Sequence, residues 1–144
     1  MNLEIERKFL VKDTHIIYDS HKSVYIYQGY FDIMVPSFRI RLIDDDKAYI
    51  TMKKKIKAGH YYEFEYEIPY QDGLKLYDMC KYKLEKKRYY VKEGSLLWEI
   101  DAYTNFNLVV AEVETTKKFK KPKWLGKEVT KDMSYTNLNL AKTS

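Results

Sequence analysis

A chain of 144 residues with an apolar fraction of 45% is most simply one domain, residues 1–144, with one hydrophobic core. The net charge of +5 arises from 26 basic and 21 acidic residues, a mixture unlike the basic surface of a typical nucleic-acid binder. Cys80 is the only cysteine, which excludes a disulfide and a thiolate zinc site. No signal-peptide pattern precedes the charged residues that begin at Glu4, and no apolar run is long enough for a membrane span. We therefore expect a cytoplasmic protein with no nucleic-acid partner and no membrane partner.

Strand-forming patterns recur along nearly the whole chain. Fifteen tyrosines and six phenylalanines favour strands over helices. The acidic turn at residues 44–47 joins two of the strands into a hairpin, and a second turn falls at Glu93–Gly94. We expect strands at residues 2–12, 24–31, 38–42, 48–55, 61–70, 84–92, 96–103 and 108–115.

Helical and irregular segments are few. Apolar residues recur near the helical period from Leu74 onward, which predicts a short helix over residues 72–83 with Asp72 as its N-cap. Residues 13–22 are expected to form a loop or a short helix, and residues 117–128 a loop. About eight strands with one or two short helices indicate a mainly β (α+β) fold, an antiparallel barrel or sandwich.

The chain opens with a strand pattern that concentrates charge. In the stretch Glu4-Ile5-Glu6-Arg7-Lys8, the residues Glu4, Glu6 and Lys8 share one face. Two neighbouring carboxylates repel each other, so their placement is favourable only when a cation lies between them. Oxygen ligands suit a hard divalent ion such as Mg²⁺ or Mn²⁺, and Lys8 would suit an anion bound to that metal.

Charged and apolar residues alternate in most of the predicted strands. In any single strand this alternation is ordinary, because a half-buried antiparallel strand shows a polar face to water. A solvated face would mix the two signs, however, since like charges side by side cost energy. Here like charges gather within strands, so a sheet closed with these faces inward would need a bound metal and a polyanion to balance its lumen. The like-charged sets are Glu4/Glu6, Arg39/Arg41, Glu63/Glu65/Glu67, Lys86/Arg88 and Glu112/Glu114.

The order of these motifs resembles that of the short bacterial members of the CYTH superfamily, the triphosphate tunnel metalloenzymes, over essentially the full length. Glu4, Glu6 and Lys8 match the opening ExExK signature of that family. The other matching positions, in chain order, are Gln28-Gly29-Tyr30, Arg39, Arg41, Lys53, Glu65, Glu67, Lys86, Arg88, Asp101, Glu112, Glu114 and residues 124–130.

The resemblance implies an eight-stranded antiparallel closed β-barrel, with one or two short helices, around a polar tunnel for a linear triphosphate. It implies a divalent metal, Mg²⁺ or Mn²⁺, with the ligands Glu4, Glu6, Glu112 and Glu114. The residues implied to bind the phosphates are Lys8, Arg39, Arg41, Lys53, Lys86 and Arg88. The implied catalytic residues are Glu6, Lys8, Glu65, Glu67, Asp101 and Tyr30. A second metal or a carboxylate (Glu65, Glu67 or Asp101) would position and deprotonate the attacking water, and Tyr30 would orient water or polarise Lys8.

The activity that the resemblance implies is hydrolysis of a small-molecule triphosphate, inorganic tripolyphosphate first. ATP or thiamine triphosphate is an alternative substrate, and a class IV adenylyl cyclase is an alternative enzyme with the same signature. A polyphosphate-binding module without turnover is the alternative outside the enzymes, and an RNA-binding barrel is disfavoured by the paired carboxylates. Because little helix is expected to cover the outside, burial of outward Phe and Tyr side chains in a homodimer is a further hypothesis.

Overall fold

The structure is a computed structural model that describes residues 2–33 and 36–143. Its strands are β1 (Leu3–Val11), β2 (Lys22–Tyr30), β3 (Ser37–Ile43), β4 (Lys47–Lys57), β5 (His60–Ile68), β6 (Tyr82–Glu93), β7 (Leu96–Tyr103), β8 (Val109–Glu114) and β9 (Leu125–Glu128). Its helices are α1 (Tyr70–Asp78) and α2 (Asn137–Lys142), with the 3-10 turns η1 (Thr14–Asp19) and η2 (Met133–Tyr135). None of the helices in these residues is both long and apolar enough to span a membrane.

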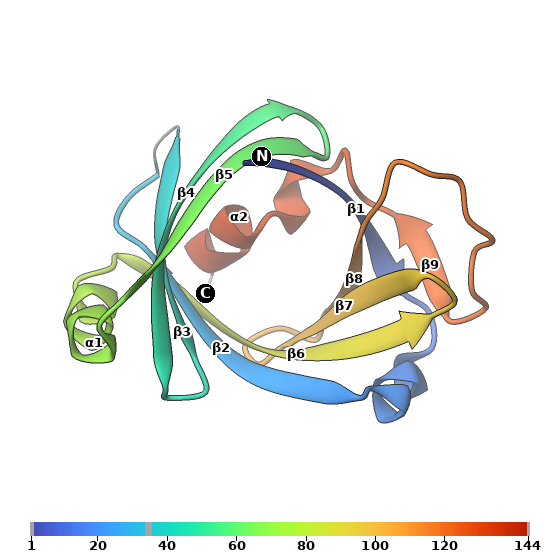
Figure 1. Cartoon of the computed structure of the whole chain (residues 1–144), viewed down its shortest axis with the longest axis horizontal. Coiled ribbons are helices and arrows are strands. Elements are labelled where there is room, and N and C mark those ends of the chain that lie inside the picture. The colour runs from blue at the N-terminus through green and yellow to red at the C-terminus, as the bar shows by residue number, and fades with distance from the viewer. Residues whose placement is uncertain (1, 34–35, 144) are drawn as a thin grey trace.

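The strands form one antiparallel sheet that closes on itself (Figure 1). The hydrogen-bonded order is β5-β4-β3-β2-β6-β7-β8-β1-β9. Strand β1 closes the sheet because it pairs with β5 through Leu3–Ile5 and with β8 through Glu6–Leu10. Strands β1 to β8 therefore form the closed antiparallel barrel that the sequence implied, and this prediction is confirmed.

The ninth strand lies in the segment 117–128, which the sequence pattern predicts as a loop, and that prediction is wrong for Leu125–Glu128. This strand pairs with the second half of β1, where Glu128 lies opposite Phe9. Arg7 adds a forked interaction, since its Nε and Nη2 donate to the two carboxylate oxygens of Glu128 at 2.9 and 2.7 Å. The partner strand is 121 positions away along the chain, so no local pattern indicates the pairing.

The predicted helix is present, but α1 runs over Tyr70–Asp78 and not over residues 72–83. Pro69 precedes its first turn, so the prediction of Asp72 as the N-cap is wrong. Asp72 lies in the first turn, where its negative charge interacts favourably with the helix dipole. The helix ends early because β6 is already paired with β2 from Tyr82 onward.

Apolar side chains on the outside of the barrel pack in two clusters. One surrounds Trp98, which is fully buried and makes edge contacts with Phe9, Phe119 and Trp124 at centroid distances of 5.2 to 5.8 Å. The other lies beneath α1, where Ile40 and other residues of β3 and β4 pack against the helix. These clusters hold the outer faces of the strands, so the polar faces are turned inward.

Helix α2 lies against the inner surface at one end of the barrel, and Figure 1 shows it within the outline of the strands. Leu140 and Ala141 are buried there in a cluster with Leu84, Tyr103 and Val110. These strand residues belong to the inner face, so this end of the lumen is apolar. The C-terminal segment therefore forms one wall of the space inside the barrel.

The packing of α1 on the barrel generates the first prediction. A Cβ added at Gly73 would overlap the Cβ of Ala48 and lie 3.1 Å from Leu42 Cδ2. Gly73→Ala is therefore expected to lower the free energy of unfolding by about 1–3 kcal/mol, although alanine favours a helix over glycine. Urea unfolding at pH 7 measures the change. Gln71→Ala on the exposed side of α1 is the matched control and should change it by less than about 0.5 kcal/mol. A stabilised Gly73→Ala protein would contradict the close approach of helix and barrel.

Candidate active site

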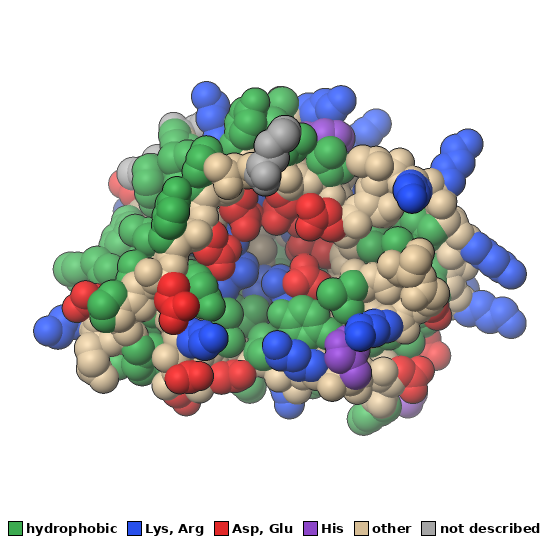
Figure 2. Space-filling view, viewed as in Figure 1, with side chains coloured by type: hydrophobic (Ala, Val, Ile, Leu, Met, Phe, Trp, Pro, Cys, Tyr) green, Lys and Arg blue, Asp and Glu red, His purple; other side chains and the backbone are tan. Residues whose placement is uncertain are grey.

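The inner face of the barrel carries the buried charge of the described chain. Figure 2 looks into the opening and shows acidic and basic side chains gathered around it. They alternate along each strand with the outward residues of the two apolar clusters, as the like-charged sets in the sequence predict. The buried polar residues are Lys8, Gln28, Arg39, Arg41, Thr51, Lys86, Arg88, Asp101 and Glu112.

Lys53 of β4 lies among three carboxylates of β1 and β5. Its Nζ is 2.9 Å from Glu4 Oε1, 3.6 Å from Glu6 Oε1 and 3.8 Å from Glu63 Oε2. Burial opposes the ammonium charge, but the carboxylates, Glu6 and Glu4 above all, outweigh it and raise the pKa of Lys53. The acidic side of the lumen therefore has a cation at its centre, and Glu63 belongs to this cluster.

Glu6 and Glu112 form a hydrogen-bonded carboxyl pair between β1 and β8. Burial and the charge of Glu112 raise the pKa of Glu6 well above its usual value. Burial also opposes ionisation of Glu112, but Lys8, whose Nζ is 3.4 Å away, and the hydrogen bond with Glu6 lower the pKa of Glu112. The two carboxyl pKa values are therefore displaced in opposite directions.

The candidate metal ligands are carboxylates of β1 and β8. In the register of these strands Glu6 lies opposite Glu114, and Lys8 lies opposite Glu112. Among the residues that the structure describes, no three acidic, His or Cys side chains converge into a complete metal site. The donor set nevertheless fits Mg²⁺ or Mn²⁺, since it offers oxygen atoms only and its carboxylates lie on two paired strands.

Arg39 and Arg41 of β3 point into the lumen from the opposite side. Arg41 Nε donates to Gln28 Oε1 at 3.0 Å, and Gln28 Nε2 donates to the Tyr30 hydroxyl at 2.8 Å. Arg39 Nε is buried and has no hydrogen-bond acceptor within residues 2–33 and 36–143. A buried donor without an acceptor favours an anionic ligand at this place.

Asp101 of β7 holds two basic residues of β6. Its two oxygens accept from Arg88 Nε and Nη2 at 2.7 and 2.9 Å, and Lys86 Nζ donates to Oδ2 at 2.8 Å. Burial opposes the charge of Asp101, but Arg88 and Lys86 lower its pKa to about 2. Burial, aided by Arg88 and Arg41 and opposed by Asp101, lowers the pKa of the fully buried Lys86 to about 7. Asp101 therefore faces two basic groups.

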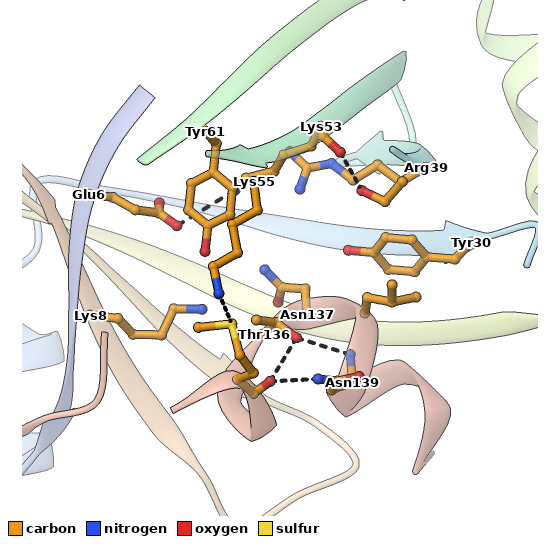
Figure 3. A pocket seen from close by; sticks show the side chains of 13 residues that line it. Glu6, Lys8, Tyr30, Arg39, Lys53, Lys55, Tyr61, Thr136, Asn137 and Asn139 are labelled. Carbon is orange, nitrogen blue, oxygen red and sulfur yellow. Dashed lines mark hydrogen bonds and ion pairs between the residues drawn. The ribbon is translucent and has the colours of Figure 1, made fainter. Parts of the chain in front are cut away.

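A cavity of about 330 Å³ lies between these strands and the C-terminal segment (Figure 3). Its strand side includes the candidate site residues Glu6, Lys8, Tyr30, Arg39 and Lys53. Its other side consists of residues 136–139 at the start of α2, together with Met133. Lys8 Nζ donates to the carbonyl of Tyr135 at 3.0 Å, so the two sides are in direct contact. The space has cations, carboxylates and neutral polar groups around it.

The remaining candidates are on the inner face but do not line this cavity. Glu65, Glu67 and Glu114 are exposed. The residues that line the cavity without having been candidates include Lys55, Tyr61 and Asn137. Lys55 and Tyr61 continue the period-two patterns of Lys53 and Glu63. Extending those two strand patterns by one more inward position would have predicted both residues. Asn137 has no such signal, because its position depends on how α2 packs.

The buried ion pairs of Asp101 generate the second prediction. Asp101→Asn leaves Lys86 without a counter-charge and Arg88 with Glu99 alone, so the free energy of unfolding at pH 7 is expected to fall by about 3–5 kcal/mol. The folded-state pKa of Asp101 lies below its ordinary 3.8, at about 2. The stabilisation is therefore complete above about pH 4 and lost as the pH falls to about 2.

Urea unfolding of the wild type and of Asp101→Asn at pH 7, 4, 3 and 2 measures this, and the difference between them should shrink below about pH 4. Asp46→Asn in the exposed β3–β4 turn is the control and should be neutral at pH 7. A loss at pH 7 below about 1 kcal/mol would contradict the buried pairing.

Solved structures from two Pyrococcus species have the same fold. A conserved hypothetical protein from Pyrococcus furiosus superposes with a TM-score of 0.64 at 20% identity and covers 80% of each chain. The PH1012 protein from Pyrococcus horikoshii superposes with a TM-score of 0.62 at 23% identity, over 79% of this chain and 80% of that one. At these identities the likeness establishes the fold.

The sequence itself has a nearer relative. An inorganic triphosphatase from Acetivibrio thermocellus is 38% identical over 154 aligned residues, which cover 99% of this chain and 95% of the relative. The family model of the CYTH domain matches residues 2–143. The resemblance noted in the order of the motifs is therefore confirmed, and the chain belongs to the CYTH family.

Proposed function

We propose that this protein is a divalent-metal-dependent hydrolase of inorganic tripolyphosphate, in which water attacks a terminal phosphoryl group inside the barrel. The observation that carries the proposal is a closed lumen in which buried basic side chains face a carboxylate cluster. A linear triphosphate with a divalent metal has the charges that such a lumen would balance. The 38% identity to an inorganic triphosphatase supports the same substrate.

For the metal we propose Mg²⁺ or Mn²⁺, held by the candidate ligands Glu4, Glu6, Glu112 and Glu114. A bound ion of this kind supplies Lewis-acid stabilisation of negative charge on phosphate oxygens. The chain contributes oxygen ligands, of which Glu4 and Glu6 are already held by Lys53 at 2.9 and 3.6 Å. Removal of the metal with EDTA is expected to stop turnover.

The basic residues are proposed to bind the phosphates. Lys8, Arg39 and Lys53 line the cavity and are positioned for direct contact. Arg41, Lys86 and Arg88 are buried without lining the cavity, and they add positive charge around it. Because the charge of a transferred phosphoryl group spreads over its equatorial oxygens, a fixed set of cations stabilises the transition state.

The attacking water is proposed to be positioned by a carboxylate of the inner face. Glu65 and Glu67 are exposed on β5, where water has access to them. Asp101 is ionised but engaged with Arg88 and Lys86, so its proposed contribution is to hold those cations in place. The Tyr30 hydroxyl lines the cavity, where it would orient water or polarise Lys8.

We also propose a cytoplasmic homodimer. The one cysteine is a free buried thiol whose pKa burial raises to about 11, which suits a reducing compartment. Phe38, Tyr62 and Tyr66 are 36%, 49% and 63% exposed on the outside of β3 and β5, and a second copy would cover them.

The experiment that tests the proposed function measures phosphate and pyrophosphate release from tripolyphosphate, ATP and thiamine triphosphate, each with Mg²⁺, Mn²⁺ or EDTA. We expect metal-dependent orthophosphate release with tripolyphosphate as the best substrate. Faster hydrolysis of ATP or thiamine triphosphate than of tripolyphosphate would assign that compound as the substrate. Pyrophosphate release from ATP would indicate an adenylyl cyclase. Tight binding of tripolyphosphate without turnover would indicate a binding module.

Two variants separate turnover from binding and form the third prediction. Glu6→Gln removes a carboxylate ligand and is expected to abolish turnover, a loss of at least about a hundredfold in kcat. Arg41→Ala removes a buried cation and is expected mainly to raise KM, by about tenfold to a hundredfold.

Steady-state kinetics on tripolyphosphate measures both effects. Glu85→Gln and Lys87→Ala, which alter the outer face of β6, are the matched controls and should retain wild-type parameters. Near-normal hydrolysis by the Glu6→Gln protein would exclude the metal assignment.

A further inference from the structure

Asn137, the first residue of α2, is held by two hydrogen bonds from the barrel. The Tyr103 hydroxyl donates to Asn137 Oδ1 at 2.6 Å, and Lys86 Nζ donates to the same oxygen at 3.2 Å. Both donors come from the inner face of the barrel and are buried. The side-chain amide is therefore attached to the wall of the lumen by its oxygen.

These contacts fix which end of the amide faces the wall. A lysine Nζ carries at least two hydrogens in either protonation state. One is directed at Asp101 Oδ2, 2.8 Å away, and another is left for Asn137. Because the ammonium form of Lys86, which is paired with Asp101, has no lone pair, the atom of Asn137 that faces it is the carbonyl oxygen. The NH₂ group, Nδ2, is then directed away from the wall.

The NH₂ group of Asn137 has no acceptor among the residues that the structure describes. Asn137 lines the cavity opposite Lys8 and Arg39, and Figure 3 shows its amide pointing from α2 into that space. Arg39 Nε, on the facing side, is likewise a donor without an acceptor. The cations Lys8 and Arg39 thus lie across the cavity from the Asn137 amide, and this arrangement suits an anion rich in acceptor oxygens.

We propose that Asn137 is a substrate-binding residue whose Nδ2 donates a hydrogen bond to a phosphate oxygen of the triphosphate. The inference rests on the proposed function and adds a neutral donor from the C-terminal segment to the cations of the strands. In this role, the hydrogen bonds from Tyr103 and Lys86 orient the amide so that its NH₂ group points toward the substrate.

The test compares Asn137→Asp with Asn137→Ala. Aspartate has the same shape and accepts from Tyr103 and Lys86 as asparagine does, but it places an oxygen where Nδ2 was. Alanine removes the donor without adding charge. If Nδ2 contacts phosphate, Asn137→Ala should weaken tripolyphosphate binding about tenfold, and Asn137→Asp about a hundredfold or more. Calorimetric titration of tripolyphosphate in EDTA measures Kd without turnover, and thermal unfolding reports the fold.

A role limited to holding Lys86 gives the opposite order, because aspartate preserves that contact and alanine does not. Binding by Asn137→Asp that equals or exceeds binding by Asn137→Ala would therefore overturn the proposal. Asn107→Asp in the exposed β7–β8 loop makes the same charge change outside the cavity and should bind like the wild type. A wild-type protein that neither binds tripolyphosphate in EDTA nor hydrolyses it with Mg²⁺ or Mn²⁺ would overturn the proposed function, and this inference with it.

A second comparison decides the matter if Asn137→Asp does not fold. Tyr103→Phe removes one hydrogen bond to Oδ1 but leaves Nδ2 and Lys86 in place, so its Kd should stay within about threefold of the wild type. Equal losses for Tyr103→Phe and Asn137→Ala would show that only the attachment of the amide matters, and would overturn the proposal.

Discussion

A charge inside a closed barrel must be matched by an opposite charge or by a ligand, and the site depends on this constraint. Arg88 and Lys86 are matched by Asp101, whereas Lys53 is matched by Glu4, Glu6 and Glu63. The basic and acidic groups are thus partly neutralised by each other in the absence of substrate. This mutual neutralisation lets a barrel of modest size keep so many ionisable side chains away from bulk water.

Two groups in the lumen are not fully matched by opposite charges or hydrogen-bond partners, and they indicate the chemistry of the ligand. Arg39 Nε has no acceptor in the described chain, and burial and the charge of Glu112 raise the pKa of Glu6 well above its usual value. The first feature calls for negative charge and the second for positive charge. A metal bound to a polyphosphate would satisfy both at once, which is a stronger constraint than either feature imposes alone.

Period-two alternation was sufficient to predict the strands and their charged faces, whereas closure into a barrel was implied only by the resemblance to the CYTH family. Lys53, Arg39 and Glu6 lie on the inner face as their strand positions require. Strand β9 could not be predicted, since its four residues are defined only by a partner far away in the chain.

The packing of α2 inside the barrel could not be predicted from the sequence either. A six-residue amphipathic helix can pack on either side of a barrel wall, and the choice depends on apolar residues such as Val110 that interrupt the charged inner face. The contacts of Asp101 could not be predicted either. Its position in the strand indicates that the carboxylate points inward, but not that Lys86 and Arg88 donate hydrogen bonds to it.

The pairing of β1 has a consequence for biosynthesis. Strand β1 precedes all of its partners, β5, β8 and β9, in the chain. Glu6 therefore cannot lie opposite Glu114 until β8 has been synthesised. Until β8 has left the ribosome, the nascent chain presents an unpaired strand edge next to a set of repelling carboxylates. Closure is therefore a late, long-range event, and the folding of this protein should be slow compared with that of chains built from local contacts.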